Sequence, residues 1–155
     1  MTQTLPQGVH EYLAQDRVIW GRPAAQAVRE ECERRGSERV FIVASKTLNR
    51  QTDAIARIRH ALGTRAVEVF DGCVEHTPRD SVVRAADAAR THRPDLIVTV
   101  GGGTAIDTAK VMQIALAHNL TEADQLSDWC LGINPDGSRR VPDVKPSPCR
   151  QIVVS

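Results

Sequence analysis

Apolar residues along the chain gather in short continuous runs. The runs at 40–44 (VFIVA), 66–70 (AVEVF) and 96–100 (LIVTV) predict strands. The first and last are almost wholly apolar, which is typical of strands covered on both faces of a sheet. Shorter extended segments are expected at 17–20 and 151–154. The sequence therefore predicts a sheet whose central strands are buried.

Between these runs, apolar residues recur at helical spacing, as at Ile55, Ile58 and Leu62. Helices are expected over 22–35, 50–62, 78–92, 105–118 and 121–128. Gly36 follows the first of them and suits its C-terminal end. Thr77 and Asp80 have the spacing of a capping box, which predicts that Thr77 begins the third helix.

Strands that alternate with helices imply right-handed crossovers and a parallel sheet. We expect an α/β fold, a Rossmann-like doubly wound parallel sheet of about five or six strands, formed by one domain over 1–155. Residues 131–150 carry several prolines and a turn sequence at 134–137, and predict a long surface loop. Ligands of such sheets bind beyond the carboxyl ends of the strands.

Composition narrows the classes of function. The chain has 155 residues, a formal net charge of +1 and 3% aromatic residues, which argues against nucleic-acid binding. No apolar run approaches the roughly 20 residues of a membrane span. Residues 1–7 lack a secretory signal pattern, so we expect a cytoplasmic protein without a membrane partner. The four cysteines form no C-x-x-C pair and are interpreted as free thiols.

The segment with the sharpest chemical content joins the strand at 96–100 to the next helix. Gly101, Gly102 and Gly103 stand at this junction. Glycines let a backbone turn tightly and let an anion approach its N–H groups, and a helix N-terminus adds a positive dipole end. The junction therefore predicts a phosphate site. It differs from G-x-G-x-x-G, since position 106 is Ile106, and from a Walker A loop, because no Gly-Lys-Ser/Thr follows.

Thr104 and Asp107 allow two interpretations. Their spacing is that of a capping box, which would explain both residues structurally. Lys110 lies three residues after Asp107, where a local ion pair is expected. The residues alone leave the structural and functional interpretations of Asp107 and Lys110 equally open.

The segment GGGTAIDTAK at 101–110 resembles the GGGS-x-x-D-x-x-K signature of the iron-containing (group III) alcohol dehydrogenases. Upstream, VIWG at 18–21 resembles the family's opening strand and glycine, and FDGCVEHTP at 70–78 resembles its F-x-G-V-x-x-N-P-T stretch. The resemblance covers nearly the whole chain. A histidine at the asparagine position, His76, is similar to the maleylacetate reductase branch.

This resemblance implies roles for individual residues. Gly101, Gly102, Gly103, Thr104 and Asp107 would bind or adjoin the pyrophosphate of NAD or NADP. His76 would lie near the adenine, although an ordinary loop residue is an equally good interpretation. Family members that prefer NAD often carry an aspartate at the position of Ser45. Here Ser45 and Lys46 would admit a 2′-phosphate, or Ser45 and Thr47 would only cap a helix.

The resemblance also implies what these 155 residues lack. Family members continue past 151–154 into a helical domain, whose aspartate and three histidines hold the catalytic Fe or Zn. The histidines of this chain are scattered over different predicted elements: His10, His60, His76, His92 and His118. We therefore expect no metal site and no catalytic residue in this chain, and no alcohol dehydrogenase activity from it alone.

The function expected is the nucleotide-binding half of an NAD(P)-dependent alcohol dehydrogenase or carbonyl reductase, a metal-dependent oxidoreductase. Its partners would be a small-molecule alcohol, aldehyde or ketone, and a homo-oligomer stays open. One alternative is a non-catalytic nucleotide-binding module or gene fragment. A phosphotransferase with a glycine-rich loop is a further alternative, but that loop has an aspartate between glycines, and Gly103 precedes Thr104 without one.

Overall fold

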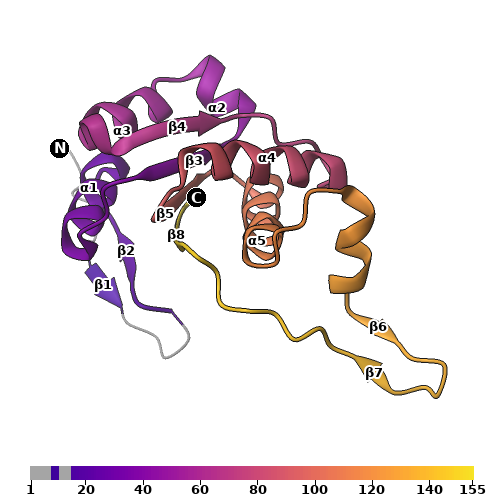
Figure 1. Ribbon diagram of the computed structural model, residues 1–155. Coiled ribbons are helices and arrows are strands. Elements are labelled where there is room, and N and C mark those ends of the chain that lie inside the picture. The colour runs from indigo at the N-terminus through magenta and orange to yellow at the C-terminus, as the bar shows by residue number, and fades with distance from the viewer. Residues whose placement is uncertain (1–7, 11–14) are drawn as a thin grey trace.

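The computed structural model describes residues 8–10 and 15–155, so residues 1–7, where no signal pattern was found, lie outside it. Its centre is a parallel sheet in the order β4-β3-β5-β8 (Figure 1). The strands are β3 (Val40–Ala44), β4 (Ala66–Phe70), β5 (Leu96–Val100) and β8 (Arg150–Val154). Every residue of β3 and β5 is buried, which confirms the prediction from their apolar runs.

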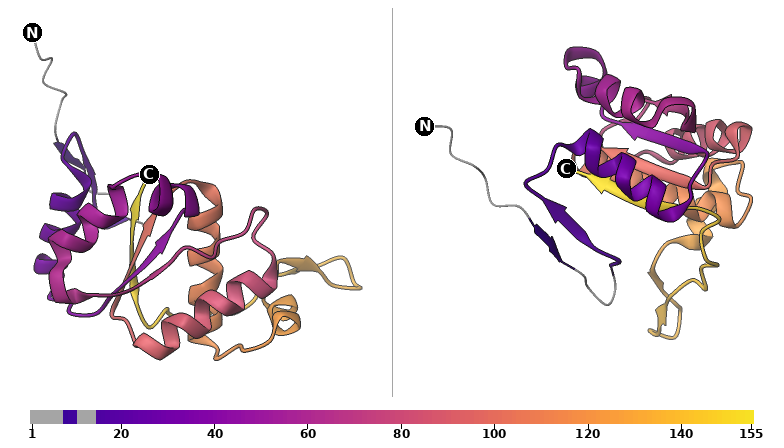
Figure 2. Two further views of the ribbon diagram at one scale, coloured as in Figure 1. Left: turned by 90° about the horizontal axis from the view of Figure 1, so that it is seen from above. Right: turned by 90° about the vertical axis from the view of Figure 1, so that its left-hand side faces the viewer.

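Helices cover both faces of this sheet (Figures 1 and 2). On one face, side chains of α1 (Ala24–Arg35) and α3 (Ala54–Leu62) pack against those of β3 and β5. On the other, α4 (Arg79–His92) and α5 (Gly103–Ala117) form a second apolar cluster with the same two strands. The doubly wound α/β prediction is confirmed, although the described sheet has four strands rather than the five or six expected.

The missing strand is found in a separate hairpin. β2 (Val18–Trp20) pairs antiparallel with β1 (Gly8–His10), not with the central sheet. The extended conformation expected near 17–20 is therefore correct, while its place in the sheet is not. A sequence run of three residues carries no information about its pairing partner, because pairing depends on contacts distant in sequence.

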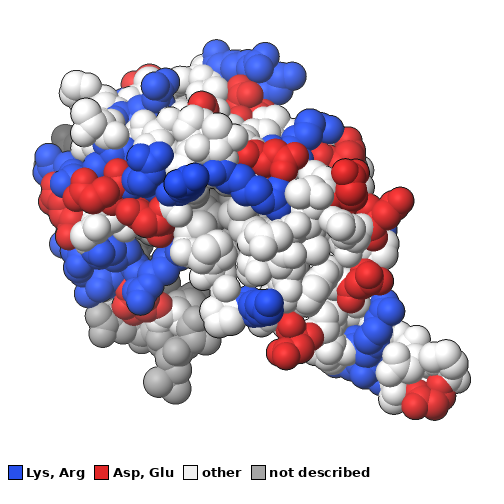
Figure 3. All heavy atoms as spheres, viewed as in Figure 1, with Lys and Arg blue, Asp and Glu red and all other residues white. Residues whose placement is uncertain are grey.

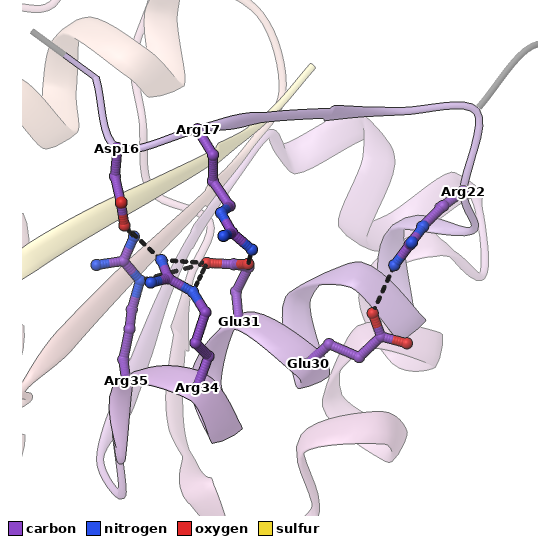
Figure 4. A network of polar contacts seen from close by, with 7 residues as sticks. All are labelled: Asp16, Arg17, Arg22, Glu30, Glu31, Arg34 and Arg35. Atoms are coloured by element: carbon purple, nitrogen blue, oxygen red, sulfur yellow. Dashed lines mark hydrogen bonds and ion pairs between the residues drawn. The ribbon is translucent and has the colours of Figure 1, made fainter. Parts of the chain in front are cut away.

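A network of charged side chains holds the segment before β2 against α1 (Figure 4). Glu31, buried on α1, accepts hydrogen bonds from Arg17 (3.2 Å) and Arg34 (2.8 Å). Asp16 accepts from Arg34 and, at 2.6 Å, from Arg35. The bond from Arg34 is the main cause that lowers the pKa of Asp16 below its ordinary value of 3.8. These ion pairs connect α1 to the segment that precedes β2.

The helix expected over 50–62 is divided in two. α2 (Lys46–Gln51) ends at Thr52, which is extended, and α3 begins at Ala54. The Thr52 hydroxyl donates to the carbonyl of Leu48 at 2.6 Å and accepts from the N–H of Ala54 at 3.3 Å. Such side-chain bonds compete with the helical hydrogen bonds of the backbone and explain the break.

The start of α4 also differs from the prediction. Pro78 is the N-cap residue, Thr77 has a left-handed φ of 49°, and no side-chain cap bond is present among the described residues. The capping box expected from Thr77 and Asp80 is therefore wrong. The loop before α4 turns through a hydrogen bond from the Thr77 N–H to the Val74 carbonyl at 3.0 Å, which removes Thr77 from the capping position.

A short 3-10 helix, η2 (Ala123–Trp129), follows α5 and leads into the predicted long loop. This loop contains a small hairpin of β6 (Gly132–Ile133) and β7 (Arg139–Arg140), which extends from the body in Figure 1. The expected turn at 134–137 is confirmed by a hydrogen bond from the Gly137 N–H to the Asn134 carbonyl at 2.9 Å. After β7 the loop leads back toward the sheet, and there the Lys145 N–H donates to Nε2 of His118, at the end of α5, at 3.0 Å.

The surface charge, the helix lengths and the cysteines bear on what was expected from composition. On the face seen in Figure 3, basic and acidic side chains are interspersed. No helix in the described part of the chain is long and apolar enough to cross a membrane. All four cysteines are free thiols, as expected, and burial raises the pKa of Cys32 to about 11.

Candidate functional site

The four parallel strands end at the same edge of the sheet. Ala44 lies opposite Val100 across β3 and β5, and Val100 lies opposite Val154 across β5 and β8. The segments that follow are therefore neighbours: Ser45 after β3, the loop 71–78 after β4 and the glycines after β5. The topology thus brings the segments that contain the sequence-predicted site residues to one edge, the edge where α/β sheets bind ligands.

Gly101 is the packed glycine of the loop. Its φ of 144° is unfavourable for other residues, and its N–H donates to the Val154 carbonyl at 3.0 Å. The neighbouring turn is fixed similarly, since the Ser45 N–H donates to the Val100 carbonyl at 2.9 Å. A Cβ at Gly101 would lie 3.0 Å from the Ser45 Cβ. The conformation of the loop therefore depends on glycine at this position.

Gly102 and Gly103 face open space instead. Both are exposed, and a Cβ on either would meet no described atom within 4 Å. Gly102 is the N-cap of α5, whose first turn has neither a side-chain cap bond nor an acidic residue among the described residues. The N–H groups of the first turn of a helix have no acceptor inside it. The geometry and the positive dipole end of α5 are suited to an anion.

The capping box expected from Thr104 and Asp107 is wrong. Thr104 lies inside α5, one residue beyond its start, and its carbonyl accepts the Thr108 hydroxyl at 2.7 Å. The helix begins two residues earlier than expected, with Gly102 as its N-cap and Gly103 as its first helical residue. Asp107 is exposed and lies 3.8 Å from the ammonium of Lys110, so the expected local ion pair is present.

Ser45 and Lys46 begin α2 beside the glycine loop. Ser45 is the N-cap residue and is half-buried, but among the described residues its side chain makes no cap bond. Lys46 is exposed at the first helical position. Ser45 therefore stands at the capping position, as one interpretation of the sequence expected, but the hydrogen bond of a side-chain cap is not formed.

Asp71 lies at the same edge of the sheet, and the sequence did not single it out. It follows β4 and accepts hydrogen bonds from Arg50 and Asn49 of α2, each at 3.0 Å. The bond from Arg50 is the main cause that lowers its pKa below 3.8, and Asn49 adds to the effect. Asp71 therefore ties α2 to the loop 71–78. Its only signal in the sequence was the Asp-Gly turn, which gives no information about a partner.

Cys73 connects the same loop to α5. Its half-buried side chain packs against the apolar cluster to which α4 and α5 contribute. Burial raises the pKa of the Cys73 thiol above its ordinary value. The loop is thus held by α2 on one side and by α5 on the other.

His76 lies at the exposed end of this loop. It has a φ of 62°, and Thr77 beside it has 49°, so two successive residues other than glycine are left-handed. Such conformations cost about 1–3 kcal/mol each and occur often at functional sites. The structure places His76 at the edge of the sheet expected for it, with its side chain exposed.

The described residues do not fit a metal centre. Among residues 8–10 and 15–155, no group of three or more His, Cys, Asp or Glu side chains is placed to hold an ion. A catalytic divalent metal needs about three protein ligands.

The parallel sheet, its two layers of helices and the glycine loop define a Rossmann-like α/β domain. The family model described as iron-containing alcohol dehydrogenase matches residues 15–154. The chain belongs to the iron-containing alcohol dehydrogenase family, as its glycine motif predicted.

Two curated relatives support this assignment. Maleylacetate reductase 2 of Cupriavidus pinatubonensis is 33% identical over 141 residues, which are 84% of this chain and 38% of the relative. The 1,3-propanediol dehydrogenase of Klebsiella pneumoniae is 37% identical over 112 residues, 70% of this chain and 29% of the relative. The chain thus spans less than two fifths of the length of either protein.

Solved structures agree with the fold. A crystal structure of 1,3-propanediol oxidoreductase is 27% identical with a TM-score of 0.62, over 84% of this chain and 31% of that one. A sulfoacetaldehyde reductase from Bifidobacterium kashiwanohense, in complex with NAD⁺, has a TM-score of 0.58 over 84% of this chain and 42% of that one. At 18% identity, this second likeness concerns the fold alone.

Proposed function

We propose that this chain is the nucleotide-binding half of an NAD(P)-dependent alcohol dehydrogenase or carbonyl reductase, and that its glycine loop binds the pyrophosphate of the cofactor. One observation carries the proposal. α5 begins at Gly103, the last of three consecutive glycines, and its N-terminus has no side-chain cap among the described residues and faces open space at Gly102 and Gly103. A backbone without Cβ atoms at the positive end of a helix is suited to a phosphate.

Each residue of the edge has a distinct role in this proposal. The N–H groups of Gly102, Gly103 and Thr104 would donate to the phosphate oxygens, while Gly101 fixes the turn. Asp107 would lie beside the pyrophosphate, one helical turn farther along α5. When bound, NAD(P) supplies the hydride that is exchanged with an alcohol or carbonyl carbon. The chain itself binds and orients the cofactor.

The adenosine half of the cofactor would lie over α2 and the loop 71–78. His76 would contact the adenine side, and Ser45 and Lys46 the ribose. No carboxylate stands at position 45, and Lys46 is exposed at the first position of α2. We therefore propose that NADPH binds at least as well as NADH.

The metal-dependent chemistry would need residues outside this chain. We propose that the 155 residues alone have no alcohol dehydrogenase activity and that Fe or Zn is held elsewhere in family members. The relatives' names suggest small alcohols and carbonyl compounds as substrates. An assay with NAD(P), added Fe or Zn and several primary alcohols should give no turnover. Turnover of about 1 per second or more would contradict this part of the proposal.

Cofactor binding is tested without catalysis by titrating the chain with NADPH and following its fluorescence. ADP-ribose, which has the pyrophosphate but no nicotinamide, should displace NADPH. Adenosine, which lacks the pyrophosphate, should displace it far less. If the chain binds neither NADPH nor NADH, the proposed function is wrong. If adenosine displaces NADPH as well as ADP-ribose does, the glycine loop does not bind the pyrophosphate.

A further inference from the structure

Three polar side chains are joined by hydrogen bonds between α5 and the sheet. Gln113 of α5 donates from its amide to Gln151 of β8 at 2.9 Å. Gln151 in turn donates to the hydroxyl of Thr99 on β5 at 2.7 Å. Thr99 is fully buried, and both glutamines are half-buried. Buried polar groups need such partners, so these hydrogen bonds restrict where Gln151 can lie.

The apolar residues of β8 are so alike that they distinguish one register from another only weakly. Ile152, Val153 and Val154 are similar in size and shape, and β5 beside them is equally uniform apart from Thr99. A slip of one residue reverses the face of every side chain in a strand. Here such a slip would take Ile152 and Val154 out of the cluster formed with α1 and α3, and would bring in Val153, which is exposed in the observed register. It would also carry Gln151 to the opposite face, away from Thr99 and Gln113.

The register matters for the glycine loop. In the observed pairing Gln151 lies opposite Ile97 and Val154 lies opposite Val100. This places the Val154 carbonyl where the Gly101 N–H donates to it at 3.0 Å. A slipped β8 would offer Gly101 a different carbonyl or none. The conformation of the loop is thus coupled to a hydrogen bond three residues away along β8.

We propose that Gln151 is a positioning residue for the cofactor site. Its amide, held between Gln113 and Thr99, selects the register of β8 and through Val154 fixes Gly101. A single buried polar residue specifies register in the same way in some helical assemblies. The link from Gly101 to phosphate binding rests on the proposed function, whereas the control of register does not.

The test uses the double variant Thr99→Val/Gln151→Leu in the full chain. It removes both polar partners at nearly constant volume, so the fold should be retained. Without cofactor, hydrogen exchange of the Gly101 amide, measured by NMR, should be about tenfold faster or more. The dissociation constant of NADPH should rise about fivefold or more. Thr99→Ser keeps the hydroxyl and should stay within about twofold of wild type in both measurements.

Wild-type exchange of the Gly101 amide in the folded double variant would overturn the proposal. If the double variant is unfolded, Gln151→Met, which keeps the length of the side chain without its amide, is measured instead and judged in the same way. A wild-type chain that binds no NADPH would refute the proposed function alone. The exchange rate of the Gly101 amide would still decide the role of Gln151.

Discussion

Gly101 and Ser45, which follow neighbouring strands, are packed so closely that a Cβ on Gly101 would lie 3.0 Å from the Ser45 Cβ and 3.4 Å from its backbone nitrogen. Because φ of Gly101 is also 144°, we expect Gly101→Ala to lower the free energy of unfolding by about 1–3 kcal/mol. Urea denaturation measures this difference. Gly102→Ala is the matched control, since its Cβ would meet no described atom within 4 Å. Equal losses in the two variants would contradict the packing argument.

Gly102→Val separates binding from stability. The valine side chain enters open space next to the first turn of α5, where the phosphates are proposed to lie. We expect the free energy of unfolding to change by less than about 1 kcal/mol. NADPH affinity should fall about tenfold or more, which corresponds to about 1.4 kcal/mol. Fluorescence titration of the folded variant checks this, and unchanged affinity would place the phosphates elsewhere.

Lys46→Ala tests the coenzyme preference. If the ammonium pairs with a 2′-phosphate, the variant should bind NADPH about tenfold more weakly and NADH within about twofold of wild type. Lys145→Ala is the control, because this exposed lysine lies in the segment that follows the β6–β7 hairpin. Competitive titration of the two coenzymes measures the preference. A tenfold preference of the wild-type chain for NADH would reverse the proposal.

Much of the fold was predictable from the sequence because its signals are local. The apolar runs at 40–44 and 96–100 became the buried central strands, and Gly36 ends α1 in the left-handed conformation expected of it. The glycine motif predicted both the family and the junction between β5 and α5. Each of these features depends on residues that are close together in the chain.

The features that were missed depend on distant contacts or on competing local bonds. Asp71 meets Arg50 across 21 residues, and Gln151 meets Thr99 across 52, so neither pair has a signature in a single sequence. The capping box expected from Thr104 is wrong because Gly102, two residues earlier, is the N-cap of α5. The continuous helix expected over 50–62 is interrupted at Thr52, because the Thr52 hydroxyl, instead of a backbone N–H, donates to the Leu48 carbonyl.

Asp71→Asn should show a pH-dependent loss of stability. The hydrogen bond from Arg50 lowers the pKa of Asp71 in the folded chain below its ordinary value of 3.8. The carboxylate therefore stabilises the folded state above that value, and the stabilisation is lost as the pH falls through the lowered folded pKa. At pH 7 we expect the variant to lose about 1–2 kcal/mol. Urea denaturation from pH 7 to pH 3 should show the difference from wild type shrinking, and a constant difference would contradict this role.

The central claim is that the backbone of the glycine loop binds the cofactor phosphates. The most direct measurement is an NMR titration of the ¹⁵N-labelled chain with NADPH, following the amides of Gly102, Gly103 and Thr104. These amides should show the largest shifts, and ADP-ribose should reproduce them. The amide of Gly36, at the C-terminal end of α1, should stay in place. Saturable NADPH binding that leaves all three loop amides unshifted would contradict the account.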